Sequence, residues 1–227
     1  MRGSEATPIV VKNVMYLPTP YGRVVALQAD SGKELWSYQV PNGQPTLRGV
    51  EYWPGDATAK PMILFSGGDK LIGLDAVTGE PRSGFWTNGA VSLREGVDNG
   101  FTTGQLSLSS PPHVYKNLVI TGLRVQESPS FGYAGDTRAW DLRTGKMVWQ
   151  FHSVPREGEP GRETWDGDSG KNRSGTNVWG FMSIDPALGL VYLPHGSPTY
   201  DFYGGDRKGA NLYGDRKSTR LNSSHRL

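Results

Sequence analysis

Cysteine is absent from the chain of 227 residues. Its absence excludes disulfide bonds and every metal site built on thiolates. The sequence also lacks an apolar run long enough to cross a bilayer, and residues 1–10 lack the apolar core of a secretory signal peptide. The sequence contains no P-loop, no zinc-ligand spacing and no Gly-x-Ser-x-Gly elbow.

Excess positive charge is confined to the C-terminal end. The formal net charge is +2, but residues 215–227 (DRKSTRLNSSHRL) contribute +3, which leaves −1 for the rest. No basic face for nucleic acid is therefore indicated. This tail has no apolar periodicity and resembles an in-frame translation of a sequencing-library adapter; a disordered basic tail is the alternative. We interpret residues 215–227 as non-native and residues 1–214 as one partial domain.

Glycine, proline and aromatic residues are plentiful, with 31 Gly, 16 Pro, 7 Trp and 10 Tyr, as is typical of turn-rich β proteins. One frame recurs at residues 26–36, 73–80 and 139–149. In its strongest copy a strand ends in Asp141, passes through a Thr-Gly turn and enters a second strand that carries Trp149. The turn glycines, Gly32, Gly79 and Gly145, lie 47 and 66 residues apart. Strand repeats at such spacing indicate the blades of a β-propeller.

Alternating patterns and turn signals predict three and a half blades. The predicted strands are 7–11, 14–18, 23–29 and 35–40; 51–54, 62–65 and 70–75; 112–115, 118–123, 137–141 and 147–152; and the hairpin 179–184 with 190–194. The last strand of the second blade is irregular, because Ser83 stands where the repeat has Trp, and Phe85 or Trp86 substitutes for it. The class is therefore all-β. Since this array cannot close into a ring, we expect a fragment of a larger propeller.

Six distinctive residues fall where the first strand of a blade begins or the second strand ends. Both positions lie at the same end of a hairpin, next to the propeller axis, so we expect these side chains to gather on one face. They are Arg48, Ser109, Ser110, Glu127, Trp179 and Ser197. A cation, hydroxyl groups, a carboxylate and a flat aromatic ring suit a planar, anionic, oxygen-rich ligand with a bound metal.

Several motifs, taken in order, resemble those of the pyrroloquinoline quinone (PQQ) dependent dehydrogenases. They are the Trp repeats, RGVEYWPGD at 48–56, SPP at 110–112, GTNVWG at 175–180 and LGLVYLP at 188–194, the last being most similar to the membrane-associated glucose dehydrogenase branch. The resemblance covers nearly all of residues 4–214. It implies an eight-bladed propeller that binds PQQ over its axis together with a divalent ion, typically calcium.

The resemblance also implies roles for the six residues. Trp179 matches the indole that stacks on the quinone, and Arg48 matches the arginine that faces the cofactor oxygens. Ser109 matches a hydroxyl donor to a PQQ carboxylate, with Ser110 beside it, and Glu127 matches the metal-binding glutamate. Ser197 stands where many relatives place a metal-binding Asn. The alternatives are a core Trp at a strand start, a surface arginine, serines that cap a turn and an exposed loop glutamate.

The implied reaction is oxidation of a glucose-like sugar or an alcohol by hydride transfer to PQQ with calcium. Electrons would pass to a membrane quinone or a cytochrome, in a periplasmic or membrane-associated protein. The family's base is an aspartate expected beyond residue 214, so no catalytic residue is assigned and the chain alone is expected to be inactive. The alternative is a non-catalytic Trp-repeat propeller scaffold of the outer-membrane assembly type.

Other residues receive plainer interpretations. The histidines His113, His152 and His195 are assigned to packing or the surface, and Trp36 and Trp149 to packing between blades. Asp206 and Arg207 are interpreted as a solvated turn rather than as substrate contacts. Two connections, 41–50 and 153–177, are too long for simple links between blades, and we expect binding there.

Overall fold

The computed structural model describes residues 4–41, 43–82, 86–214 and 223–226. Within these residues strands dominate, and the helical structure is a single 3₁₀ turn, Arg162–Thr164. None of the described residues belongs to a helix long and apolar enough to cross a membrane. The chain divides into two compact units: unit 1 is Met1–Leu93, Ser107–Thr121 and Ala139–Val148, and unit 2 is Arg94–Leu106, Gly122–Arg138 and Trp149–Leu227.

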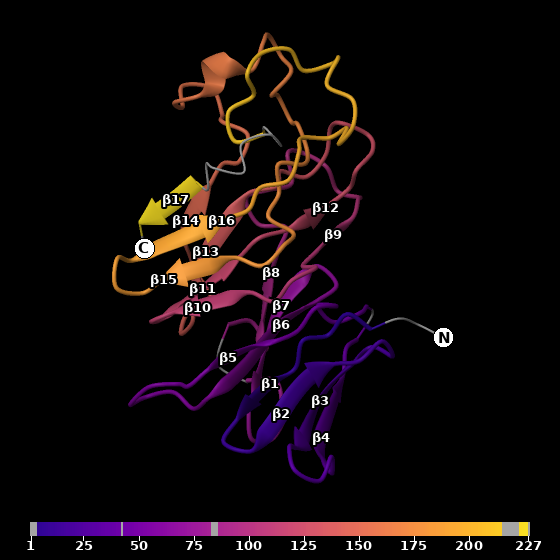
Figure 1. Ribbon diagram of the computed structural model, residues 1–227, viewed down its shortest axis with the longest axis vertical. Coiled ribbons are helices and arrows are strands. Elements are labelled where there is room, and N and C mark those ends of the chain that lie inside the picture. Colours follow the sequence, from indigo (N-terminus) through magenta and orange to yellow (C-terminus); the bar gives the residue numbers. More distant parts are fainter. Residues whose placement is uncertain (1–3, 42, 83–85, 215–222, 227) are drawn as a thin grey trace. The chain divides into compact units, whose positions relative to one another are not determined.

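The first sheet is a four-stranded antiparallel blade in unit 1, and its strands run side by side in Figure 1. It contains β1 (Ile9–Val11), β2 (Val14–Pro18), β3 (Arg23–Gln28) and β4 (Glu34–Gln39), in the order β1-β2-β3-β4. The predicted blade is confirmed with small shifts at its ends. The first strand begins at Ile9 rather than at residue 7, because Thr7 forms a parallel bridge with Gly49 instead.

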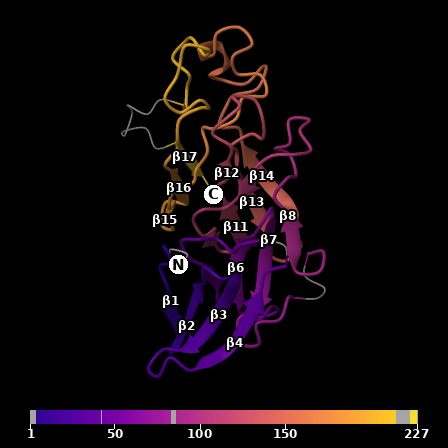
Figure 2. The same cartoon turned by 90° about the vertical axis from the view of Figure 1, so that its right-hand side faces the viewer.

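The second sheet, also in unit 1, contains β5 (Glu51–Trp53), β6 (Met62–Gly67), β7 (Lys70–Asp75) and β8 (Ala90–Ser92). Figure 2 shows β6, β7 and β8 next to one another, in the order that the pairing gives. Strand β6 is buried along its whole length, which fits its continuous apolar run. The last strand is displaced along the chain to residues 90–92, in agreement with the predicted irregularity.

The core of unit 1 lies between these two sheets. Inward-facing side chains of both sheets form a single apolar cluster: Tyr16, Val24, Ala26, Val40, Val50, Ile63, Phe65, Ile72, Leu74 and Ala76. Full burial of a large aliphatic or aromatic side chain stabilises the fold by about 1.5–3 kcal/mol. The alternation that predicted the strands is thus the pattern that binds one blade to the next.

The repeat's tryptophan attaches one blade to the turn of the following blade. The indole Nε1 of Trp36 donates a hydrogen bond to the carbonyl oxygen of Ala76 at 3.1 Å. Gly79 in that turn has φ +76°, and a Cβ there would lie 2.6 Å from the Trp36 ring. Glycine is required at this position for both reasons. The predicted packing role of Trp36 is confirmed.

The same attachment recurs between the second and third blades. The Nε1 of Trp86 donates to the carbonyl oxygen of Asp141 at 3.2 Å. Gly145 has φ +68°, and a Cβ on it would lie 2.3 Å from the Trp86 ring. Trp86 therefore takes the place of the missing repeat tryptophan, as one of the two predicted substitutes; the other, Phe85, lies outside the described residues.

The aspartate of the repeat holds the turn on which the tryptophan rests. Asp141 Oδ1 accepts hydrogen bonds from the backbone N–H groups of Arg143 and Thr144, at 2.9 and 2.8 Å. Asp75 does the same for Val77 and Thr78, at 2.9 and 3.1 Å. A short side chain that satisfies two backbone donors explains why Asp recurs at this point of the frame.

The predicted third blade and half-blade are present, together with one small sheet that the sequence did not predict. The third blade contains β10 (His113–Tyr115), β11 (Leu118–Thr121), β13 (Thr137–Asp141) and β14 (Met147–Phe151), and a two-stranded sheet contains β9 (Leu106–Ser107) and β12 (Arg124–Val125). The predicted half-blade is β15 (Ser183–Asp185) with β16 (Leu190–Leu193). Strand β17 (Ser223–Arg226) pairs with β16, so part of the tail's backbone is in a strand. The interpretation of this tail as non-native stays a prediction.

Candidate functional site

Three of the six predicted residues meet in unit 1. Arg48 precedes β5, and Ser109 and Ser110 precede β10. The backbone N–H of Arg48 donates to the carbonyl oxygen of Ser109 at 3.2 Å, and its guanidinium Nη1 lies 3.5 Å from the Ser110 hydroxyl. Ser110 is buried. The structure thus brings these three residues together, and their role in binding a cofactor stays a prediction.

A carboxylate also lies against the Arg48 guanidinium. The Nε of Arg48 donates to Glu5 Oε2 at 3.1 Å, and the Arg48 side chain is 25% exposed while that of Glu5 is 64% exposed. Glu5 was missed by the sequence reasoning, since nothing in its local pattern sets it apart. The contact shows that the Arg48 guanidinium can pair with a carboxylate, which is the kind of group that the predicted cofactor carries.

Trp179 lies in unit 2 on an anchored segment rather than at the start of a strand. The predicted strand 179–184 is wrong at its beginning, because β15 starts at Ser183. The carbonyl oxygen of Val178 accepts from Leu123 N–H at 3.1 Å, and Asn177 Nδ2 donates to the carbonyl oxygen of Leu123 at 2.7 Å. Trp179 is 48% exposed. A half-exposed indole on a fixed backbone is suited to stacking on a flat ligand, and its burial in a core is excluded.

The residues just before Trp179 carry two features that sequence reasoning missed. Thr176 has φ +51°, a conformation that a β-branched residue rarely adopts. Its hydroxyl is buried and has no hydrogen-bond partner within the described part of the chain. Its backbone oxygen does have one, since His195 Nδ1 lies 2.8 Å away. Backbone strain and an unsatisfied polar group together are characteristic of ligand sites, and an oxygen-rich cofactor such as PQQ is chemically able to satisfy this hydroxyl.

Glu127 and Ser197 belong to neighbouring segments of unit 2. Thr199, two residues after Ser197, donates through its hydroxyl to the carbonyl oxygen of Gln126 at 3.3 Å. Ser197 is 6% exposed, and its carbonyl oxygen accepts from Thr176 N–H at 2.9 Å. Glu127 lines a pocket of about 490 Å³ that also contains Asp201. We call it the Glu127 pocket, and its full lining is Glu127, Ser128, Tyr200, Asp201, Phe202 and Tyr203.

The oxygen atoms of the Glu127 pocket suit a hard cation, although only two of its lining side chains, Glu127 and Asp201, are carboxylates. The carboxylates of Glu127 and Asp201 supply the oxygen ligands that calcium prefers. Among the described residues, no group of three or more His, Cys, Asp or Glu side chains is placed to hold a metal ion. Calcium at Glu127 would therefore need further oxygens from backbone, hydroxyl groups, water or a cofactor. Asp201 is an additional carboxylate that the sequence motifs did not indicate.

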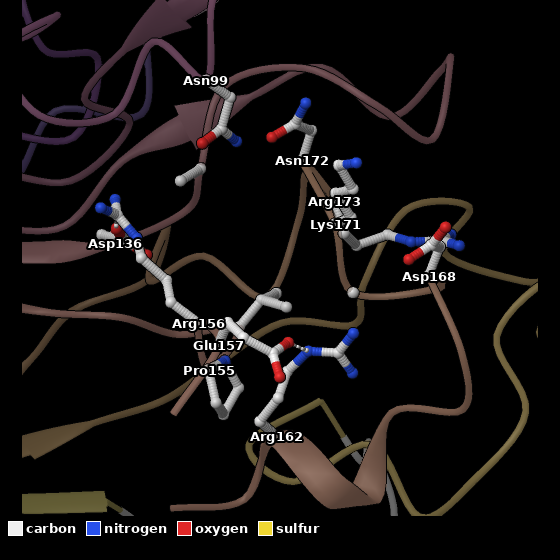
Figure 3. Close-up of a pocket in the computed structure, with 13 residues that line it drawn as sticks. Asn99, Asp136, Pro155, Arg156, Glu157, Arg162, Asp168, Lys171, Asn172 and Arg173 are labelled. Carbon is white, nitrogen blue, oxygen red and sulfur yellow. Dashed lines mark ion pairs between the residues drawn. The ribbon is translucent and has the colours of Figure 1, made fainter. Parts of the chain in front are cut away.

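A second cavity, of about 440 Å³, lies in the long connection 153–177 of unit 2, where binding was expected (Figure 3). Arg162 lies 3.4 Å from Glu157, and the dashed line in Figure 3 marks this ion pair. Burial raises the pKa of the Asp136 carboxyl, against a hydrogen bond of 2.7 Å from Gln150. None of the six predicted site residues lines this cavity.

Asp206 is more than a solvated turn residue. Its carboxylate accepts a hydrogen bond of 2.9 Å from Nη1 of Arg173, whose side chain is 1% exposed. Asp206 is exposed and lies in a turn, as predicted, and its carboxylate in addition balances the charge of a buried guanidinium. Arg207 next to it donates to Asn211 Oδ1 at 3.1 Å. The Arg173–Asp206 pair fixes the loop that follows Ser197. This loop forms one side of the Glu127 pocket.

A buried carboxyl group in unit 1 faces a histidine. Glu51 Oε2 lies 3.6 Å from His113 Nδ1, and both side chains are about three-quarters buried. Burial raises the pKa of Glu51 to about 7, although the hydrogen bond from Tyr52 N–H acts in the other direction. Burial likewise lowers the pKa of His113. His113 is thus a packing residue, as predicted, but it is paired with a group that titrates near neutral pH.

The site residues form two groups, each described within its own unit: Arg48 with the two serines in unit 1, and Glu127, Trp179 and Ser197 in unit 2. That all six gather on one propeller face stays a prediction. Each group offers chemistry suited to the expected ligand: hydrogen-bond donors for anionic oxygens in the first, and a stacking surface and carboxylates in the second.

Comparison with known proteins identifies relatives for most of the chain. Residues 1–216 match the family model described as the glucose/ethanol/alcohol dehydrogenase β-propeller domain (PQQ). The chain is 32% identical to the quinate/shikimate dehydrogenase (quinone) of Acinetobacter baylyi, over 91% of this chain and 28% of that protein. It is 33% identical to the quinoprotein glucose dehydrogenase of Gluconobacter oxydans, over 90% of this chain and 28% of that protein.

A solved structure shares the fold. The crystal structure of quinohemoprotein alcohol dehydrogenase from Comamonas testosteroni matches with a TM-score of 0.75 and 28% identity, covering 93% of this chain and 32% of that one. The all-β propeller class predicted from the sequence is confirmed by this match and by the strand content. The chain thus spans about a third or less of the length of these relatives, which fits the predicted fragment.

Proposed function

The chain belongs to the PQQ β-propeller family of glucose, ethanol and alcohol dehydrogenases, and we propose that the whole protein oxidises the C–OH group of a sugar or an alcohol by hydride transfer to PQQ. The proposal concerns the whole protein, because the chain spans 28% of the length of each of its two curated relatives described above. Both of these relatives are dehydrogenases by name, which favours the enzyme over the alternative of a non-catalytic scaffold.

The observation that carries the proposal is the contact of the Arg48 guanidinium with the Ser110 hydroxyl at 3.5 Å. Two donors that share one anionic oxygen, or hold neighbouring ones, recognise the carboxylate-rich edge of a planar quinone. The Arg48 cation favours whichever form of the bound ligand carries more negative charge. Its contact with Glu5 at 3.1 Å supports this assignment, since it is already a carboxylate contact.

The other residues of the proposal hold and orient the ligands. When bound, PQQ supplies a quinone carbon that accepts hydride. Trp179 offers an indole face that fixes the plane of the cofactor. Glu127, with Asp201, contributes oxygens to a calcium ion, and Ser109 and Ser197 contribute a hydroxyl donor and a hydroxyl ligand. We place the catalytic base, an aspartate, beyond residue 214, so no residue described here removes the substrate proton.

The substrate, electron acceptor and location follow as parts of the same proposal. A glucose-like sugar or another polyol is the substrate class favoured by the relatives from Gluconobacter oxydans and Acinetobacter baylyi, which are named for glucose and for quinate or shikimate. The latter is also named for a quinone, which favours a membrane quinone as acceptor, with a cytochrome as the second choice. We further propose that the whole protein lies in the periplasm, at or near the membrane.

The test is dye reduction that depends on added PQQ. The complete protein, reconstituted with PQQ and calcium, should reduce a redox dye with glucose or quinate as substrate, and should lose this activity when PQQ is left out. The chain of 227 residues should give no rate above a control without enzyme. A complete protein that binds no PQQ and reduces no dye would support the scaffold instead, and dye reduction by the chain alone would contradict the placement of the base.

A further inference from the structure

The Glu127 pocket has an aromatic side that the proposed cofactor contacts do not use. Three of its lining residues are aromatic and lie close together in one loop: Tyr200, Phe202 and Tyr203. Their exposed fractions are 37%, 90% and 61%. Large aromatic side chains are usually buried or in contact with a ligand or a partner, so a group of exposed rings around a pocket marks a binding surface.

The loop that carries these rings is fixed at both ends. Before them, Thr199 donates to the carbonyl oxygen of Gln126 at 3.3 Å, and the neighbouring Gly175 leaves no room for a Cβ, which would lie 2.4 Å from Thr199 N. After them, Asp206 pairs with the buried Arg173 at 2.9 Å. The loop backbone is therefore anchored on both sides of these residues, which lowers the cost of ordering it around a ligand.

The two kinds of side chain in the pocket recognise two faces of one ligand. The carboxylates of Glu127 and Asp201, which we propose as calcium ligands, keep further oxygen lone pairs that accept hydrogen bonds from neighbouring hydroxyl groups. The rings of Phe202 and Tyr203 pack against C–H groups, for which the negative face of an aromatic ring is well suited. A polyol ring has hydroxyl groups around its edge and C–H groups on its faces. The pocket volume of about 490 Å³ is within the range of about 300–1,000 Å³ that is typical of small-molecule sites.

We propose that Phe202 and Tyr203 are specificity-determining residues that select ring-shaped polyols, such as pyranoses and cyclohexane polyols, over short-chain alcohols. This inference rests on the proposed function and assigns the substrate class of the same site. A short alcohol has one hydroxyl group and too few C–H groups to cover both rings, so it gains little from the aromatic side. The carboxylates of Glu127 and Asp201 then orient the bound polyol, and the rings of Phe202 and Tyr203 favour ring-shaped polyols over short alcohols.

The test compares substrates rather than a single rate. In the complete protein reconstituted with PQQ, Phe202→Ala and Tyr203→Ala should each raise KM for glucose and quinate about tenfold, and change KM for ethanol less than about twofold. The rate at saturating substrate and the affinity for PQQ should stay close to the parent values. The conservative variant Phe202→Trp should restore most of the preference for polyol rings. Tyr21→Ala, which removes an aromatic residue of 64% exposure in unit 1, is the matched control and should change neither KM.

Equal losses for ring polyols and ethanol, or no change for either, would overturn the assignment while leaving the proposed function intact. A direct binding measurement separates a failure of the aromatic assignment from a failure of the proposed function. Saturation-transfer NMR with quinate and with ethanol on the complete protein should show contact with quinate that is lost in Phe202→Ala. If this result held in a protein without any PQQ-dependent activity, the polyol surface would stand and the proposed function would fail. If quinate contact were absent or unchanged in Phe202→Ala, the inference would be wrong.

Discussion

The indole Nε1 of Trp36 donates a hydrogen bond to the carbonyl oxygen of Ala76 at 3.1 Å, across the boundary between two blades. Trp86 makes the equivalent bond to Asp141 at 3.2 Å. The tryptophans of the first two blades therefore pack against the Asp-to-Gly turn of the next blade, and the glycine in that turn leaves room for the ring. This relationship makes the stability of one blade depend on the turn of its neighbour.

We expect Trp36→Ala to lower the free energy of unfolding by about 3 kcal/mol, because it removes both the ring packing and the hydrogen bond. Trp36→Phe should cost about 1 kcal/mol, since much of the packing remains and the hydrogen bond is lost. Leu35→Ala, at a neighbouring residue of 48% exposure, is the control and should stay within about 0.5 kcal/mol. Urea denaturation followed by circular dichroism measures all three. Similar losses for Trp36→Ala and Leu35→Ala would contradict the role of the ring.

Glu51 gives the protein a predicted pH dependence. Its pKa in the folded state is about 7, above the ordinary value of 4.5. The folded state therefore binds this proton more tightly than the unfolded state, and the stability it contributes is present below pH 4.5 and is lost as the pH rises through 7. The loss is at most about 3 kcal/mol. His113, whose pKa is lowered by burial, acts in the opposite direction at the acidic end, where its charging opposes folding.

The measurement is the free energy of unfolding at pH 5, 6, 7 and 8 for the parent and for Glu51→Gln. Because Gln cannot ionise, the variant should gain stability relative to the parent as the pH rises, by up to about 3 kcal/mol between pH 5 and 8. The variant His113→Phe should keep the alkaline part of the parent's decline. A constant difference between parent and Glu51→Gln across this range would show that Glu51 does not titrate there.

How far the sequence could predict the structure depended on whether the signal was local. Alternation and turn residues are local, so strands such as Val14–Pro18 and Lys70–Asp75 were predicted with their observed bounds. Trp86 could be named as a substitute for the missing repeat tryptophan for the same reason. The strand predicted from Trp179 failed at its start, because Asn177 and Val178 bond to Leu123, far away in the sequence.

The candidate site shows the same division. Motifs predicted Arg48, Ser110 and Glu127 as site residues by their residue types and order along the chain. The sequence motifs do not indicate Asp201, because the loop at 200–203 reaches the Glu127 pocket only in the folded chain. The ion pair of Asp206 with Arg173 could not be predicted, because the two residues lie 33 positions apart along the chain. Pairings of this kind leave no local pattern to read.

The ion pair of Arg173 and Asp206 should be important for the loop that carries the aromatic rings. Asp206→Ala leaves a guanidinium of 1% exposure without its counter-charge, which should lower the free energy of unfolding by about 3 kcal/mol. Asp168→Ala removes an exposed carboxylate from the same unit and should stay within about 0.5 kcal/mol. Thermal denaturation of the two variants measures the difference. If both variants unfolded at the same temperature, the pair would not be holding this loop.

Binding of PQQ to the complete apo-protein distinguishes a PQQ dehydrogenase from a propeller without a cofactor. Equilibrium titration with PQQ should show that Trp179→Ala weakens binding about tenfold or more, whereas Trp179→Phe keeps most of the affinity. Phe181→Ala is the matched control, since Phe181 is 49% exposed and Trp179 is 48% exposed, and it should bind PQQ like the parent. An affinity for PQQ that is the same in Trp179→Ala as in the parent would contradict the account and favour a propeller without a cofactor.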